Sequence, residues 1–168
     1  MSKPRGQADS LARPLPRGIA ECFSYIVNTY KTVSGEVVVV ATSSPNVDRA
    51  YNALLEIFSK CVRPRFGTVA IERVNISSDD IYSSEDLWEL IEKVEVKTEK
   101  GDFVDVTGGR KVMSIALALA AIRAGARVIT TVIPQMEYSR VQALLEKGYS
   151  EPCELLSKQS RTIVLYLK

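Results

Sequence analysis

The 168-residue chain contains no histidine. It therefore lacks the side chain that most often acts as a general base near neutral pH and most often binds metal ions. It also lacks a strong excess of one charge, because it has 22 basic and 20 acidic residues. The resulting net charge of +2 argues against broad electrostatic binding of long nucleic acids, so any basic site must be local.

Cysteine is scarce, with Cys22, Cys61 and Cys153 lying far apart in the chain. Their number and spacing match neither a disulfide framework nor a zinc site, so we predict reduced thiols. No apolar run is long enough to cross a bilayer, and the N-terminus lacks the pattern of a signal peptide. We therefore expect a cytoplasmic protein with no membrane partner.

What the chain does contain is hydrophobic residues, at 46% of the total, enough for one domain with a substantial core. Continuous β-branched runs, typical of strands buried on both faces, alternate with stretches of helical periodicity. The expected strands are 36–41, 68–76, 103–106, 127–133 and 162–167, and the expected helices are 18–31, 47–58, 87–94, 111–124 and 138–148. This order predicts an α/β fold, a Rossmann-like three-layer α/β/α sandwich around a mainly parallel sheet.

The two ends of the chain depart from plain alternation. Residues 1–35 form an N-terminal extension with one helix, ahead of a Rossmann-like domain at 36–168. Near the C-terminus, segment 154–157 is a candidate to pair with strand 162–167 as an antiparallel hairpin.

The most informative stretch joins a predicted strand to a predicted helix and reads Asp105-Val106-Thr107-Gly108-Gly109-Arg110-Lys111. Two adjacent glycines allow a sharp turn and a close approach of a ligand to the backbone. The helix that follows presents unpaired N–H groups and a partial positive charge at its start, where Arg110 and Lys111 add two full charges. Together these features predict an anion site, in particular for phosphate.

A structural interpretation of the same stretch is equally open. Thr107 could be only the N-cap of the helix, and Asp105 could only accept hydrogen bonds from loop N–H groups. The glycines could serve only the turn. The stretch is not a P-loop, and it lacks the G-x-G-x-x-G spacing of dinucleotide-binding turns.

Two more turns follow predicted strands. The first strand ends in Thr42-Ser43-Ser44-Pro45-Asn46, and strand 127–133 ends in Pro134-Gln135-Met136. Ser44 before a proline fits an N-cap followed by proline in the first helical position, which would be a structural role. Because ligands of open α/β sheets bind at the carboxyl ends of the strands, these turns are also expected to converge with 105–111 on one pocket.

Two remaining features bear on partners and metals. The predicted helix 111–124 is apolar almost all round, so we expect it to be buried under other helices or against a second subunit. The acidic residues Asp79, Asp80, Glu85 and Asp86 have no metal-ligand spacing, so we expect solvated loop and helix-start charges there. Ser83 and Asp86 form a capping-box pattern.

The string from Asp105 to Met113, in its strand-to-helix setting and together with the Thr-Ser-Ser-Pro turn, resembles the CARF domains. These are the CRISPR-associated Rossmann-like sensors of cyclic oligoadenylates. The resemblance covers residues 36–168 and implies a homodimer that binds a cyclic oligoadenylate, often cyclic tetra-adenylate, across its two-fold axis. Many members carry a C-terminal effector, and we expect none here because the chain stops at Lys168, directly after a strand. Residues 1–35 also depart from the family, and they could cover the sheet, brace the dimer or close the pocket.

CARF proteins without an effector are similar to the stand-alone ring nucleases, which cut cyclic tetra-adenylate and switch off type III CRISPR signalling. The resemblance implies catalysis through Ser44, or its neighbour Ser43, and Lys111, with no metal and no cofactor. The ligand-binding positions that we predict are Thr42, Ser43, Asn46, Thr107, Gly108, Gly109, Arg110, Gln135 and Met136. RNA supplies its own nucleophile, the 2′-OH, so a protein that holds it in line needs no histidine. The products would be linear di-adenylate with a 2′,3′-cyclic phosphate.

Two other functions stay open. A non-catalytic sensor would hold cyclic oligoadenylate with the same groups and signal to a partner protein, and the missing effector favours the nuclease over it. A Rossmann enzyme that depends on a mononucleotide or dinucleotide would suit the fold, but the missing G-x-G-x-x-G argues against it.

Overall fold

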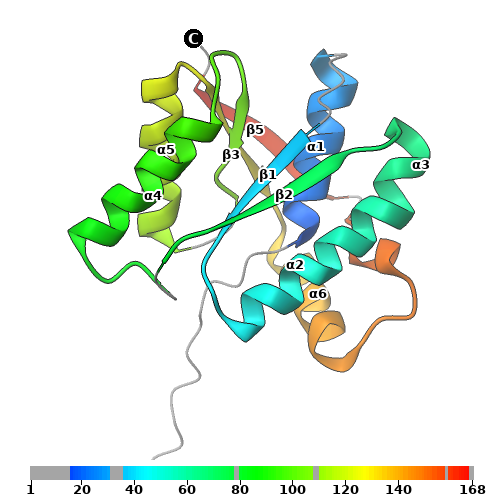
Figure 1. Cartoon of the computed structure of the whole chain (residues 1–168). Coiled ribbons are helices and arrows are strands. Elements are labelled where there is room, and N and C mark those ends of the chain that lie inside the picture. The colour runs from blue at the N-terminus through cyan, green and yellow to red at the C-terminus, as the bar shows by residue number, and fades with distance from the viewer. Residues whose placement is uncertain (1–15, 31–35, 78–79, 108–109, 158, 167–168) are drawn as a thin grey trace, which may run out of the picture.

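The computed structural model describes residues 16–30, 36–77, 80–107, 110–157 and 159–166. The helices are α1 (Pro16–Tyr30), α2 (Pro45–Ile57), α3 (Arg63–Phe66), α4 (Ser84–Lys97), α5 (Lys111–Ala124) and α6 (Gln135–Lys147), with a π-helical segment η1 (Phe58–Val62) and a 3-10 turn η2 (Pro152–Leu155). The strands are β1 (Glu36–Ala41), β2 (Ala70–Asn75), β3 (Phe103–Asp105), β4 (Arg127–Val132) and β5 (Arg161–Tyr166) (Figure 1). The mixed α/β class is therefore confirmed.

Within the described residues, the strands form two separate sheets rather than the single predicted one. β1 and β2 run parallel, with Glu36 opposite Ala70. β3 and β4 also run parallel, with Phe103 opposite Arg127, and β5 pairs antiparallel with the other edge of β4. Both parallel pairs fit the expected sheet, but a Rossmann-like sandwich around one sheet is not confirmed.

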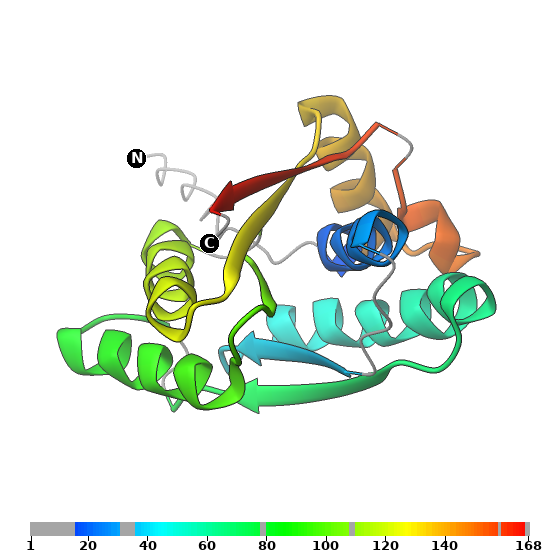
Figure 2. The same cartoon turned by 90° about the horizontal axis from the view of Figure 1, so that it is seen from above.

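Helix α1 lies in the interior of the molecule. It packs against α2 on one side and against β4 and β5 on the other, as the end-on view in Figure 2 shows. Its Ala20 and Phe23 belong to the same hydrophobic core as Leu54 and Ile57 of α2 and Val141 of α6. The helix of the N-terminal extension is thus part of the main core.

A second core joins the pair α4 and α5 to the β1–β2 sheet. Its buried members from the two helices are Leu90, Ile91, Val94, Ala116 and Ala120. Val40, near the end of β1, and Met113, in the first turn of α5, pack against this cluster. The core therefore sets the start of α5 relative to the carboxyl end of β1.

The carboxyl ends of β1, β2, β3 and β4 all point to the lower side of the molecule in Figure 1. The turns that follow β1, β3 and β4 consequently lie at one edge, as expected for ligand-binding turns of α/β proteins.

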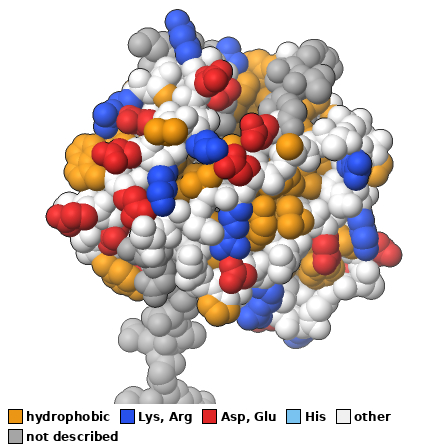
Figure 3. Space-filling view, in the orientation of Figure 1, with side chains coloured by type: hydrophobic (Ala, Val, Ile, Leu, Met, Phe, Trp, Pro, Cys, Tyr) orange, Lys and Arg blue, Asp and Glu red, His pale blue; other side chains and the backbone are white. Residues whose placement is uncertain are grey.

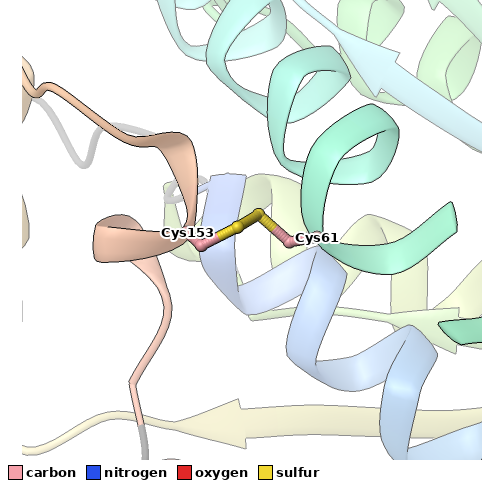
Figure 4. The surroundings of a disulfide bond; sticks show 2 residues. All are labelled: Cys61 and Cys153. Atoms are coloured by element: carbon pink, nitrogen blue, oxygen red, sulfur yellow. A yellow bond between two sulfur atoms is a disulfide. The ribbon is translucent and has the colours of Figure 1, made fainter. Parts of the chain in front are cut away.

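Two predictions, about the C-terminal hairpin and about the cysteines, are wrong. Segment 154–157 does not pair with the last strand, because Pro152–Leu155 is a 3-10 turn and β5 pairs with β4 instead. Cys61 and Cys153 are not reduced thiols but form a disulfide between η1 and η2, with 5.7 Å between their Cα atoms (Figure 4). The prediction of a reduced thiol is confirmed for Cys22, which is buried.

The surface carries charges of both signs. On the face in Figure 3, acidic and basic side chains are interspersed, with hydrophobic side chains between them. None of the described helices combines the length with the hydropathy that a membrane crossing needs.

Candidate functional site

The turn after β1 caps helix α2. Ser44 has an extended backbone, with φ −147° and ψ 152°, and its side chain accepts a hydrogen bond from the Val47 N–H at 3.3 Å. Pro45 follows in the first turn, so the structural role predicted for Ser44 is confirmed. Ser43 is exposed and Ser44 is half-buried, whereas Thr42 is only 8% exposed. The hydroxyls of Ser43 and Ser44 are thus more accessible to a ligand than that of Thr42.

Arg73 on β2 holds the same turn from the neighbouring strand. Its Nη2 lies 2.7 Å from Asp48 Oδ1 and donates to the Thr42 carbonyl at 3.3 Å. Its Nε donates to Asn75 Oδ1 at 2.7 Å, and its guanidinium lies 5.1 Å from the centre of the Tyr51 ring. Arg73 was not among the predicted site residues, although an arginine inside a predicted strand is a signal of a specific partner.

The turn after β3 is organised around the Asp105 carboxylate. Its Oδ1 accepts hydrogen bonds from the Thr107 N–H at 2.9 Å and from the Thr107 hydroxyl. The Thr131 N–H on β4 donates to the same hydroxyl oxygen at 2.6 Å. The N-cap of α5 is Arg110, which has no side-chain cap bond. The structural role predicted for Asp105 is therefore confirmed, and the assignment of Thr107 as the N-cap is wrong.

The environment of Asp105 changes its acidity. Burial raises the pKa of Asp105 to about 6, and the hydrogen bonds from Thr107 oppose that rise. Cys22 of α1 lies beside this carboxylate, and burial, followed by the charge of Asp105, raises the pKa of the Cys22 thiol. Both groups are poorly hydrated, which favours their neutral forms.

The two basic residues at the start of α5 differ in their contacts. Arg110 forms an ion pair with Asp80, which is 6% exposed and accepts a hydrogen bond from the Ile81 N–H at 2.8 Å. The expectation of a solvated Asp80 is thus wrong. Lys111 begins α5, is exposed and forms no ion pair with the described part of the chain. Residues 108–109 of the predicted anion site lie outside the described residues, and Lys111 stands at the N-terminus of α5.

The turn after β4 is the beginning of a helix. Gln135 and Met136 are the first residues of α6, and Met136 is 85% exposed. An open hollow of about 550 Å³ lies nearby and is lined by Val132, Pro134, Gln159, Ser160 and Arg161. Neither Ser44 nor Lys111 lines this hollow, so it does not enclose the predicted catalytic pair.

Two further predicted features lie near these turns. Asn46 is half-buried and accepts a hydrogen bond from the Arg49 guanidinium at 3.4 Å. The capping box at the start of α4 is confirmed, since the Asp86 N–H donates to Ser83 Oγ at 3.1 Å and the Ser83 N–H donates to Asp86 Oδ2 at 3.0 Å. Asp86 therefore serves the start of the helix.

Contacts between loops join the turns into one edge. The ion pair of Arg110 ties the start of α5 to the loop after β2. The Ile76 N–H in that loop donates to the Ala41 carbonyl at 3.1 Å, which ties the loop to the end of β1. The turn before α2 and the start of α5 thus lie at the same edge, although no contact within the described chain joins Ser44 and Lys111 directly.

Helix α5 leaves an apolar stripe exposed. Its buried residues are Ala116, Ala120 and Ala121, which face α4 and the strands. Its exposed apolar residues are Val112, Ile115, Leu119 and Ile122, with exposed fractions of 45%, 58%, 47% and 43%. Their spacing places them on one face of the helix. We predicted that this helix is buried on more than one side. Within a single chain, only its alanine face is buried.

Comparison with known proteins identifies the family. Residues 25–127 match the family described as CRISPR-associated protein NE0113. Over 126 residues, the chain is 40% identical to the CRISPR system ring nuclease SSO2081 of Saccharolobus solfataricus, and the match covers 75% of this chain and 70% of that relative. The family match includes both the Ser44 turn and Lys111. The chain therefore belongs to the CRISPR-associated NE0113 family, and its predicted resemblance to the CRISPR-associated ring nucleases is confirmed.

Proposed function

We propose that this protein is a ring nuclease that binds cyclic oligoadenylate, in particular cyclic tetra-adenylate, at a homodimer interface. It cleaves the ring without a metal to linear di-adenylate with a 2′,3′-cyclic phosphate, and it thereby switches off type III CRISPR signalling. One observation carries the proposal: Lys111 is exposed at the N-terminus of α5, at the same edge as the Ser44 turn. The 40% identity to a protein named as a ring nuclease supports the reaction class.

Lys111 would stabilise the charge that develops on the phosphate. The ribose 2′-OH attacks the phosphorus and loses its proton, while the 5′-oxygen leaves and gains one. Negative charge grows on the non-bridging oxygens as the new bond forms. The Lys111 ammonium and the N–H groups of the first turn of α5 would bind those oxygens together.

Ser44 would orient the sugar-phosphate group. Its hydroxyl oxygen accepts the Val47 N–H, so its own proton is still available to donate to a ribose or phosphate oxygen. A hydroxyl that is held by a helix cap is pre-oriented, and holding the 2′-OH in line can contribute up to about 7–11 kcal/mol in the best cases. Ser43 is the alternative donor, because it is exposed beside Ser44.

The exposed stripe on α5 would form the dimer interface. Val112, the first residue of the stripe, directly follows Lys111. A two-fold axis along this face would bring the Lys111 of each subunit to one shared ligand. Two copies of the Ser44 turn would then act on opposite sides of a four-nucleotide ring and yield two dinucleotides.

The direct test incubates the protein with cyclic tetra-adenylate in excess EDTA and identifies the products by mass spectrometry. We expect di-adenylate with a 2′,3′-cyclic phosphate. Intact ligand that co-elutes with the protein would favour the non-catalytic sensor instead. A protein that neither binds nor cuts the ligand would refute both functions.

The interface is tested by placing a charge on the stripe. Leu119→Glu should convert the dimer to a monomer in light scattering and abolish cleavage, because it buries an unpaired carboxylate in the interface. Val96→Glu on α4 is the matched control, since Val96 is 84% exposed and lies outside the stripe. A dimeric Leu119→Glu variant would contradict this interface.

A further inference from the structure

Helix α1 packs directly against the turn that leads to Lys111. Gly18, the third residue of α1, is buried. A Cβ atom at this position would lie 2.9 Å from Thr107 Cγ2 and 3.9 Å from Ile133 Cδ1. The first distance is shorter than carbon atoms tolerate, so a hydrogen atom is the largest substituent that fits between α1 and Thr107.

Thr107 has little freedom to move away from a larger neighbour. Its hydroxyl donates to Asp105 and accepts from the Thr131 N–H at 2.6 Å, and its own N–H donates to Asp105 at 2.9 Å. A rotation about χ1 that moved the methyl group would break both hydroxyl bonds. Cys22, one turn along α1 from Gly18, is buried beside Asp105, the carboxylate that accepts both Thr107 bonds.

The turn is connected to Lys111 through the first turn of α5. Ser114 Oγ donates to the Val106 carbonyl at 3.3 Å, and the Val106 N–H donates to the Ile129 carbonyl at 2.9 Å. Val106 is bonded to Thr107, and Ser114 lies one turn from Lys111. A displacement of Thr107 would therefore also shift the first turn of α5, which carries Lys111.

The presence of glycine at this position has a cost. Glycine inside a helix is less favourable than alanine by roughly 0.5–1 kcal/mol. Gly18 lies in a helix without a left-handed backbone, so no turn requires it. Glycine is required here because Thr107 occupies the space that a side chain at position 18 would need.

We propose that α1 is a positioning element of the active site, in which Gly18 and Thr107 are matched positioning residues that set the orientation of Lys111. The inference rests on the proposed nuclease function and extends it to the N-terminal helix. Gly18 and Thr107 act on the rate through the geometry of the turn, without contact with the reacting atoms.

A double-mutant cycle tests the match. Gly18→Ala should lower kcat for cyclic tetra-adenylate about 10- to 100-fold, because small misplacements of a catalytic group have effects of this size. Ligand affinity should change much less than kcat, and the thermal midpoint should fall, because the overpacking of Thr107 outweighs the better helix propensity of alanine. Thr107→Ser removes Cγ2 and keeps the hydroxyl. In a protein that already carries Thr107→Ser, Gly18→Ala should therefore lower kcat by less than about twofold.

Thr29→Ala is the matched control, because Thr29 is an exposed residue of the same helix. If Gly18→Ala cleaves at the normal rate, or is equally slow with and without Thr107→Ser, the inference is wrong. If Gly18→Ala does not fold, the double variant decides: recovered folding and cleavage support the match, and continued failure overturns it. The unmodified protein separates the two failures. If it does not cleave the ligand, the proposed function is wrong and this inference falls with it. If it cleaves and Gly18→Ala cleaves equally fast, only this inference is wrong.

Discussion

Arg110 forms an ion pair with the buried carboxylate of Asp80, whereas its neighbour Lys111 is left unpaired within the described chain. Two adjacent cations that look equivalent in the sequence therefore have different roles. Arg110 fastens the start of α5 to the loop after β2. Lys111 is exposed at the start of α5, as the proposed contact with a phosphate requires.

Lys111→Ala should slow cleavage of cyclic tetra-adenylate by roughly 10²–10³, the usual cost of losing one donor to a developing negative charge. Single-turnover rates measured by mass spectrometry would check this. Lys147→Ala is a matched control, because Lys147 is also an exposed lysine, in the last turn of α6. A Lys111→Ala variant with the normal rate would show that our site assignment is wrong.

Ser44 has a structural and a proposed catalytic role, and two substitutions separate them. Ser44→Ala should cost about 1 kcal/mol of unfolding free energy through the lost N-cap, whereas Ser44→Gly should cost only a few tenths. Both should lose the same cleavage activity, because both lack the hydroxyl. Urea unfolding and single-turnover rates measure the two effects. If Ser43→Ala, rather than either Ser44 variant, removes the activity, Ser43 is the acting residue.

Asp105 should make the stability of the protein depend on pH. Burial raises its pKa from 3.8 to about 6, so the folded state holds a proton that the unfolded state releases. This stabilisation is complete below about pH 4 and is lost as the pH rises through 6, by up to about 3 kcal/mol. Asp105→Asn keeps an oxygen for the Thr107 bonds and does not titrate, so its unfolding free energy should lack this decline. If the unfolding free energy of the two proteins depended on pH in the same way, the raised pKa of Asp105 would be contradicted.

The disulfide between Cys61 and Cys153 should stabilise the fold by about 2–5 kcal/mol, because it closes a loop across 92 residues. Chemical reduction should lower the thermal midpoint, and it should have no effect on a Cys61→Ser/Cys153→Ser variant. One thiol, that of the buried Cys22, should react with a thiol reagent only after unfolding. Three reactive thiols in unreduced, unfolded protein would show that the bond does not form.

Features set by neighbours in the sequence could be predicted well. The N-cap at Ser44 and the capping box at Ser83 and Asp86 both appear as expected. Each depends on the backbone bonds of one helix end, so a few adjacent residues decide it. The phosphate-site prediction around Lys111 used the same local logic.

Features that depend on distant residues could not be predicted in this way. The burial of Asp80 requires Arg110 to arrive from another loop, and the pairing of β5 with β4 brings together strands separated by a helix. The disulfide joins cysteines that no spacing rule connects.

The sequence by itself determined the main order of helices and strands, the caps of α2 and α4 and the candidate residues Ser44 and Lys111, because periodicity and cap chemistry act over a few residues. Only the tertiary structure decided which of these residues are free to act. It paired Arg110, occupied the Thr107 hydroxyl and placed Gly18 of α1 against that threonine, because packing and hydrogen bonding between distant segments determine which groups are already engaged.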